Sequence, residues 1–279
     1  MGRISALTEL TSLESNDYLI VLDSSANIAK KITIANAFGL PSFGFTATGE
    51  SWTFSSWDST TKIGVITVPT DATTKYSAGM RVKFTQTTGG TKFGIIHDVT
   101  ATTLSVFFGT DYTLNNEAIT SPLYSTEYAP KGFPASKEKW LIQAIDTTSR
   151  KSNTPSKATW YLPSGATSNI TLGKGKYMLG MEVSARSHSS ASSTWCQTQV
   201  AVSTSTSSAT DSEFISSASS DQASSGLITL TESFKREKIV TITSNTTYRI
   251  IHYSDVHGTM GNTNGFESNA RIYAYSAYI

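Results

Sequence analysis

Apolar and polar residues alternate in short runs along most of this chain, and turn residues separate the runs. The segment from Lys176 to Ala185 gives the longest example. Its apolar members occupy every second position: Tyr177, Leu179, Met181, Val183 and Ala185. Side chains two residues apart lie on the same face of a strand, so this spacing predicts a strand with one buried face. Helical spacing is rare, and the chain is therefore expected to be all-β.

Turn-rich segments divide the pattern into three regions. Residues 1–40 form a distinct N-terminal segment, and residues 41–134 carry strand-like runs that predict a small β-barrel or sandwich. Residues 135–279 are again strand-like, beyond a Pro-, Gly- and Lys-containing boundary at 131–139. The final run, Ala270 to Ile279, is so aromatic that we expect it to be paired in a sheet and packed.

Two places depart from the strand pattern. Ile4, Leu7, Leu10 and Leu13 are three residues apart, which predicts a short helix, and a further helical turn is expected from Thr33, as its N-cap, to Phe38. Between these helices, strands are expected at 18–22 and 28–34. The Ser- and Thr-rich stretch 203–225 is predicted to be an exposed loop around one short edge strand.

The composition narrows the possible functions. Ser and Thr make up roughly a third of the 279 residues, charged residues only 15%, and the formal net charge is +1. This balance gives no electrostatic basis for binding nucleic acid or an anionic membrane. A single cysteine, Cys196, excludes an intramolecular disulfide, and no apolar run is long enough to span a bilayer. The N-terminus lacks the apolar core of a signal peptide, so synthesis in a reducing cytoplasm without export is expected.

Candidate catalytic and metal sites are weak. His252, Asp255 and His257 are close in sequence, but on a strand the two histidines would face opposite sides, so we expect no metal site. No nucleophile elbow, phosphate loop or HExxH motif is present. Two pairs of carboxylates could serve a glycosidase but are better explained as solvated surface charge: Asp211 with Glu213, and Glu232 with Glu237. We therefore expect a protein without enzymatic activity and without a cofactor.

Recognition of glycans is a more suitable interpretation of this composition. Aromatic rings stack on sugar faces, although most rings of a β protein are expected to be in the core. Loops on a rigid β scaffold commonly carry recognition, and the candidates here are 187–193, 203–225 and 256–266. The residues predicted to contact a glycan are Trp195, Phe214, His257, Asn262 and Asn264.

Three stretches of sequence resemble proteins of bacteriophage virions. The N-terminal strand that ends in Asp23, followed by a short turn and KKITIANAF at 30–38, resembles the opening of many phage and prophage fibre and minor structural proteins. The run from GESWTF at 49–54 to GFP at 132–134 is similar to a middle module of such proteins in Gram-positive hosts. The pattern YMLGMEVSA, REKIVTITSNTTYRIIHYSD and NARIYAYSAYI resembles the jelly roll at the tip of phage fibres, which is similar in outline to tumour-necrosis-factor and C1q-type heads.

The resemblance implies a homotrimeric, non-enzymatic virion fibre protein, located on the capsid or tail surface. Its N-terminal segment would anchor the chain to capsid or tail proteins through the following residues: Leu7, Leu10, Leu13, Tyr18, Leu19, Ile20, Val21 and Leu22. Its jelly-roll head would bind bacterial cell-surface polysaccharide. The sequence leaves open whether it is a head fibre or a tail protein. It also leaves two alternatives, a decoration or spacer protein without a ligand and a polysaccharide-degrading tailspike.

Overall fold

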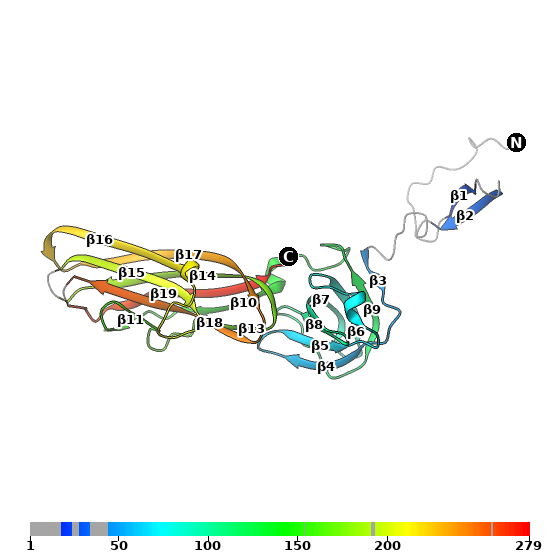
Figure 1. Cartoon of the computed structure of the whole chain (residues 1–279), viewed down its shortest axis with the longest axis horizontal. Helices are drawn as coiled ribbons and strands as arrows, with labels where there is room; N and C mark the ends of the chain where they lie inside the picture. Colours follow the sequence, from blue (N-terminus) through cyan, green and yellow to red (C-terminus); the bar gives the residue numbers. More distant parts are fainter. Residues whose placement is uncertain (1–17, 24–27, 34–43, 154, 191–192, 258) are drawn as a thin grey trace.

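A computed structural model describes residues 18–23, 28–33, 44–153, 155–190, 193–257 and 259–279. In this part of the chain nineteen strands form four antiparallel sheets, with three single-turn 3₁₀ helices between them: η3 (Ala72–Thr74), η4 (Lys137–Trp140) and η5 (Ser212–Phe214). Figure 1 shows the jelly roll at one end of the molecule and the seven-stranded sheet beside it. The prediction of an all-β chain is confirmed for the described residues.

The first sheet is a hairpin of β1 (Tyr18–Asp23) and β2 (Ile28–Thr33), in which Tyr18 pairs with Thr33 and Asp23 with Ile28. Both strands predicted here are confirmed. Thr33 is the last residue of β2, and the remainder of the helical turn predicted from it lies outside the described residues. The helix predicted around Leu7, Leu10 and Leu13 lies outside them too.

The middle of the chain forms one seven-stranded sheet in the order β3-β9-β6-β7-β8-β5-β4. Its strands are β3 (Thr46–Ala47), β4 (Thr53–Asp58), β5 (Ile63–Thr67), β6 (Arg81–Gln86), β7 (Gly90–Val99), β8 (Thr103–Phe107) and β9 (Ile119–Ser125). The edge strands β3 and β4 are not hydrogen-bonded to each other, so the sheet is open and does not close as a barrel. The seven-stranded region has a hydrophobic core of its own, which includes Trp52, Phe84 and Phe108.

The C-terminal part is a jelly roll of two five-stranded sheets. One sheet has the order β10-β19-β14-β17 with β11 paired to β19, and the other has the order β12-β18-β15-β16 with β13 paired to β18. The strands are β10 (Leu141–Asp146), β11 (Arg150–Asn153), β12 (Thr159–Tyr161), β13 (Asn169–Leu172), β14 (Gly175–His188), β15 (Ser193–Ser203), β16 (Ile215–Gly226), β17 (Thr229–Ile242), β18 (Thr246–Val256) and β19 (Asn264–Ser276). From β13 onward every connection except β15 to β16 passes between the two sheets, which is the topology of a jelly roll.

Alternation along β14 produces the core of the jelly roll. The five apolar residues predicted to share a face, from Tyr177 to Ala185, are all buried. The C-terminal strand β19 lies between β10 and β14 with Ile272 and Ala274 in the core, so the prediction of a paired, packed terminus is confirmed.

The prediction for residues 203–225 was wrong in part. An edge strand is present, but β16 is 12 residues long and pairs with β15 from Ala201↔Ile215 to Ser193↔Gly226. Serine and alanine contribute little apolar area, yet a strand satisfies its backbone through a neighbour whatever its side chains are. The composition of this stretch therefore did not reveal how long a strand would pair with β15.

A buried joint connects the seven-stranded sheet to the jelly roll. Ile95 and Phe107 of the sheet belong to the same core cluster as Tyr177 of the jelly roll. The imidazole Nε2 of His97 lies 2.9 Å from the hydroxyl of Ser276. The connecting segment adds a stacked pair of rings, Phe133 and Trp140, with centroids 5.1 Å apart. The predicted domain limits at residues 40 and 134 stay predictions, and this core runs across the second of them.

Candidate functional site: the distal end of the jelly roll

Four connections between strands meet at the end of the jelly roll farthest from the joint. Strand β14 begins at Gly175, beside the ring of His97, and ends at His188. Around His188 lie the connections β11–β12, β14–β15, β16–β17 and β18–β19, as the pairs His188↔Thr229 and Asn153↔Asn264 show. Figure 1 shows this end pointing away from the seven-stranded sheet. We call it the distal end.

Backbone hydrogen bonds fix the described residues of the β18–β19 connection, 257 and 259–263, against β14 and β15. The amide of Gly261 donates to the carbonyl of His188 over 2.7 Å, and the amide of His257 donates to the carbonyl of Trp195 over 2.9 Å. Ser189 and Met260 form an isolated antiparallel bridge. The connection is therefore held at His257, Met260 and Gly261.

Two asparagines lock three of the connections together. Asn153 Nδ2 donates to the carbonyl of Asn264 over 3.1 Å, and Asn264 Nδ2 donates to the carbonyl of Asn153 over 3.3 Å. Asn264 also donates to the carbonyl of Gly261 and accepts from the amide of His188 over 2.7 Å. All four bonds attach a side chain to backbone, so the two residues set the path of the loops.

Polar side chains fill the interior beneath these loops. His252 is fully buried and is hydrogen-bonded to the hydroxyls of Tyr161 and Thr198, both at 2.7 Å. The hydroxyl of Ser254 is hydrogen-bonded to Ser187 Oγ and to Asn264 Oδ1. Burial lowers the pKa of His252 to about 3, so the ring is neutral near pH 7. Apart from the half-buried Tyr161, the members of this network are buried, and they support the loops from inside.

The structure divides the five predicted glycan contacts. Trp195, His257 and Asn262 lie at the distal end, where His257 and Asn262 are exposed, and their contact role stays a prediction. Phe214 is 1% exposed and packs in the core, because it is the apolar anchor of η5 beside β16. Asn264 is fully buried in the lock just described. The prediction that Phe214 and Asn264 contact a glycan was therefore wrong.

Two residues of the distal end were missed by the sequence analysis. Leu227, in the turn between β16 and β17, is 66% exposed and is the most prominent apolar side chain there. Asn153 is the other half of the lock. Of the two, only Leu227 could have been identified from the sequence, because it is a leucine between a Ser-rich stretch and a predicted strand.

Replacing Asn264 with alanine is expected to lower the free energy of unfolding by about 2 kcal/mol or more, because it leaves buried backbone groups at His188 and Gly261 without partners. Urea unfolding measures the loss, and hydrogen exchange in residues 257–263 should become faster. The matched control is Asn262→Ala on the same loop, where the side chain is exposed and the expected change is within about 0.5 kcal/mol. Equal free energies of unfolding for the two variants would show that the hydrogen bonds of Asn264 do not stabilise these loops.

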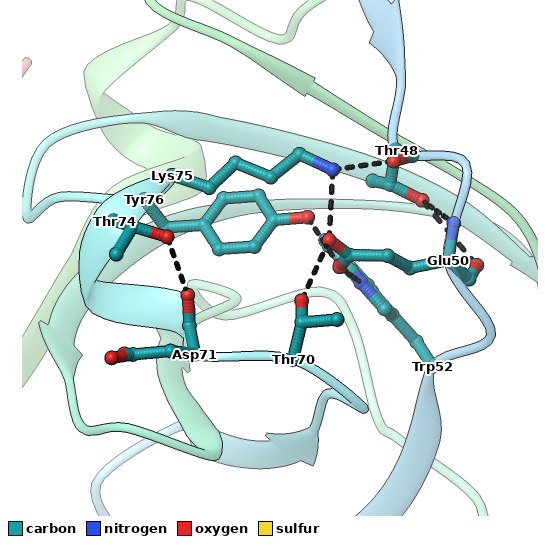
Figure 2. A network of polar contacts seen from close by, with 8 residues as sticks. All are labelled: Thr48, Glu50, Trp52, Thr70, Asp71, Thr74, Lys75 and Tyr76. Carbon is teal, nitrogen blue, oxygen red and sulfur yellow. Dashed lines mark hydrogen bonds and ion pairs between the residues drawn. The ribbon is translucent and has the colours of Figure 1, made fainter.

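A second polar cluster lies in the seven-stranded region and is centred on Glu50 (Figure 2). Its carboxylate accepts hydrogen bonds from Tyr76 at 2.8 Å, Lys75 at 2.9 Å, Thr70 at 3.1 Å and Trp52 at 3.3 Å. Burial raises the pKa of Glu50, but these four hydrogen bonds outweigh it, and the pKa lies below its usual value. The carboxylate is thus a satisfied anion that ties 48–52 to η3.

The Glu50 cluster offers little for catalysis or sugar binding. Trp52 is 2% exposed and packs edge-on against Tyr76 and Phe84, so its ring is core. Lys75 also donates to the carbonyl of Thr48, which completes its bonding. The cluster is best explained as a structural tie between the β3–β4 and β5–β6 connections.

Three of the four carboxylates considered for a glycosidase are engaged elsewhere. Lys238 forms ion pairs with both Asp211 and Glu213, and the hydroxyl of Tyr273 donates to Glu237 over 2.6 Å. Within the described ranges, no group of three or more His, Cys, Asp or Glu side chains is arranged to hold a metal ion. Among the same residues, no helix is long and apolar enough to cross a membrane.

Comparison with known proteins finds few similarities. No family model matches the chain, and no curated protein matches it. Two similar solved structures are a structure of the infectious bursal disease virus Gx strain, at 9% identity, and the T13 viral particle of the same virus, at 10% identity. Both TM-scores are 0.25, and the matches cover 92% and 93% of this chain. The chain spans less than two thirds of those proteins, 63% and 62%. TM-scores this low do not establish a shared fold.

Proposed function

We propose that this chain is a structural fibre protein of a bacteriophage virion whose jelly-roll head binds the bacterial cell surface. Residues 1–40 attach it to capsid or tail proteins, and the seven-stranded sheet is a spacer. The observation that carries the proposal is the direction of the jelly roll. Its strands run from a buried joint at Gly175 to the loops around His188, so the distal end faces away from the preceding part of the chain.

The sequence resemblance supports the placement on a virion, and the surface of the distal end supports recognition. Loops on a rigid β scaffold are a common location for binding residues. Here the Asn153–Asn264 lock and the bridge from Ser189 to Met260 hold the loops in one arrangement. A preorganised surface loses less entropy on binding than a flexible one.

Self-association as a homotrimer is part of the proposal. On the outer face of the β10-β19-β14-β17 sheet, four cross-strand neighbours form one apolar row: Leu141, Tyr275, Met178 and Ile239. Ile239 is 49% exposed, although its neighbours are apolar. Leu141, Tyr275 and Met178 are half-buried, and a partly exposed apolar row that crosses four strands is the kind of surface that contact between copies buries.

Replacing Ile239 with lysine is expected to reduce the mass in solution from three chains toward one, because a charge would be desolvated in the contact. Size exclusion with light scattering measures the mass. Ser217→Lys is the matched control, since it adds the same charge at an exposed position of the other sheet, and its assembly should be unchanged. An unchanged mass for Ile239→Lys would place the contact elsewhere.

A non-enzymatic role is proposed as well. It is supported by the ion pairs of Lys238 with Asp211 and Glu213, which leave that carboxylate pair engaged, and by the burial of His97 and His252. Release of reducing sugar from host cell wall by the pure protein would support the tailspike alternative in its place.

Deletion of residues 1–40 tests attachment to the virion. The truncated protein should keep the circular dichroism and cell binding of the head but be absent from purified particles. Its presence on particles at the level of the full chain would exclude the N-terminal segment as the anchor. A full chain that is found on particles but binds no host cell would identify a decoration or spacer protein.

A further inference from the structure

An open hollow of about 410 Å³ lies on the outer face of the β10-β19-β14-β17 sheet. Its lining includes Ser184 of β14, Ser233 of β17 and Asn269 of β19. Ser184 is six residues beyond Met178 along β14, which is about 20 Å at the rise of an extended strand, so the hollow is separate from the apolar row. The volume is within the range of sites for small molecules, about 300–1,000 Å³.

Three uncharged polar side chains at the hollow can take up a ligand. Asn269 and Ser233 are exposed and Ser184 is half-buried, and none of the three side chains is hydrogen-bonded to another described residue. Ser184 and Ser233 are direct cross-strand neighbours. Amide and hydroxyl groups both donate and accept hydrogen bonds. The three groups are therefore open to solvent, close together and suited to a partner that also donates and accepts.

A β-bulge presents Asn269 at the hollow. The register of β14 and β19 shifts between the pairs Glu182↔Arg271 and Ser184↔Ser268, and Asn269 has a φ of +51°. Glycine adopts this left-handed region readily, whereas other residues are uncommon there. Bulges often direct a side chain beside a functional site. Asparagine thus places an amide group at a position where glycine would suit the backbone better.

The charges beside the hollow are balanced. Glu182 and Lys235, which both line it, form an ion pair of 2.9 Å, and Arg271 contacts the same carboxylate at 3.3 Å. Glu237, two residues from Lys235 on the same face of β17, supplies a second carboxylate, so two anions face two cations. A neutral ligand with several hydroxyl groups fits this lining better than an anion or a cation.

We propose that Asn269, Ser184 and Ser233 bind the hydroxyl groups of a neutral sugar in this hollow. The inference deepens the proposed recognition of the bacterial cell surface and rests on it for the source of the sugar. Phe234 also lines the hollow and is half-buried, so it adds apolar surface for a C–H face of the sugar. The ion pair of Glu182 and Lys235 adds a fixed acceptor and a fixed donor.

The variant Asn269→Gly tests the site because it removes the amide group and suits the backbone. In the full chain without sugar, its urea midpoint should equal or exceed that of the unchanged chain. The backbone amide signals of Ser184 and Ser233 should shift in NMR spectra with at least one of glucose, galactose and N-acetylglucosamine. The affinity from these shifts should fall by about tenfold or more in Asn269→Gly. Asn116→Gly, at an exposed asparagine between β8 and β9, should leave the affinity unchanged.

Four results would overturn the site. A lower urea midpoint for Asn269→Gly would mean that the amide group has a structural role. Equal affinity in Asn269→Gly and the unchanged chain would place the sugar elsewhere. Shifts with inorganic phosphate and with none of the sugars would mean an anion site. Absence of any shift, in a chain that still binds host cells, would refute the site and leave the proposed function standing.

Two further results separate the site from the proposed function. Sugar-dependent shifts that are weakened in Asn269→Gly, in a chain that binds no host cell, would support the site and refute recognition of the cell surface. A chain that neither shifts with the sugars nor binds host cells would refute both.

Discussion

Replacing Arg81 with methionine is expected to lower the free energy of unfolding by about 3 kcal/mol or more. The guanidinium is 2% exposed and donates to three carbonyl groups, those of Gly79, Tyr128 at 3.0 Å and Tyr278 at 2.5 Å. The rings of Tyr128 and Phe133 both lie 5.2 Å from it. Methionine fills similar space but leaves the carbonyls without a donor, at about 1–3 kcal/mol for each one that stays buried.

Urea unfolding at pH 7 measures the effect of Arg81→Met. Lys176→Met is the matched control, because it makes the same kind of change at an exposed residue of β14 and should cost less than about 0.5 kcal/mol. Arg81→Lys should fall between them, since one ammonium group cannot bond three carbonyls in the plane of a guanidinium. A loss below about 1 kcal/mol for Arg81→Met would show that the contact between β6 and residue 278 does not hold the joint.

Acid is expected to destabilise the fold steeply through two buried histidines. Burial, and then the nearby charge of Arg81, lower the pKa of His97 to about 3, and burial lowers the pKa of His252 to about 3, from the usual value of about 6.5 in the unfolded chain. Between about pH 3 and pH 6.5 the unfolded chain binds more protons than the folded one. The stabilisation that comes from the two neutral histidines is therefore fully present above about pH 6.5 and is lost as the pH falls. Each histidine contributes about 1.4 kcal/mol per pH unit in this window.

The free energy of unfolding measured at pH 7, 5 and 4 tests this slope. Carboxylates with lowered pKa values add to the acid loss, so the informative quantity is the difference between variants. His97→Gln and His252→Gln should each reduce the slope by about 1.4 kcal/mol per pH unit. Asn262→Gln, at an exposed residue that does not titrate, should leave it unchanged. If all three variants had the slope of the unchanged chain, neither buried ring would be neutral in the fold.

The strands were predictable where alternation is strict. In β14, every second residue from Tyr177 to Ala185 is apolar, and one face is buried as expected. The same holds for Val82 and Phe84 in β6, whereas Met80, just before the strand, is only half-buried. The terminal strand β19 was recognisable from its aromatic residues. In these segments the side chains themselves encode the face that packs.

Features that depend on pairing with a distant strand were not predictable. The serine- and alanine-rich β16 extends over 12 residues because β15 supplies its hydrogen bonds, and no local pattern records this. Asn264 looked like a loop residue suited to a glycan, but its partners His188 and Asn153 are 76 and 111 residues away in the chain. The outer-face row at Ile239 also requires the register of three strand pairs.

The joint and the distal end have complementary roles in the proposed fibre. The apolar joint, with Phe107 and Tyr177 in one cluster, fixes the orientation of the jelly roll on the seven-stranded sheet. The polar interior near His252 and Ser254 fixes the loops instead, because side-chain hydrogen bonds are directional and specify one arrangement. If three heads assemble, weak contacts at each distal end add up, and avidity can exceed a single contact by about 10²–10⁴.

The mass of the full chain in solution, from light scattering after size exclusion, tests the proposed trimeric head most directly. The account predicts about three times the 30.0 kDa of one chain. A mass of one chain at all concentrations would contradict it, because the apolar row at Leu141, Tyr275, Met178 and Ile239 would then face water in a monomer.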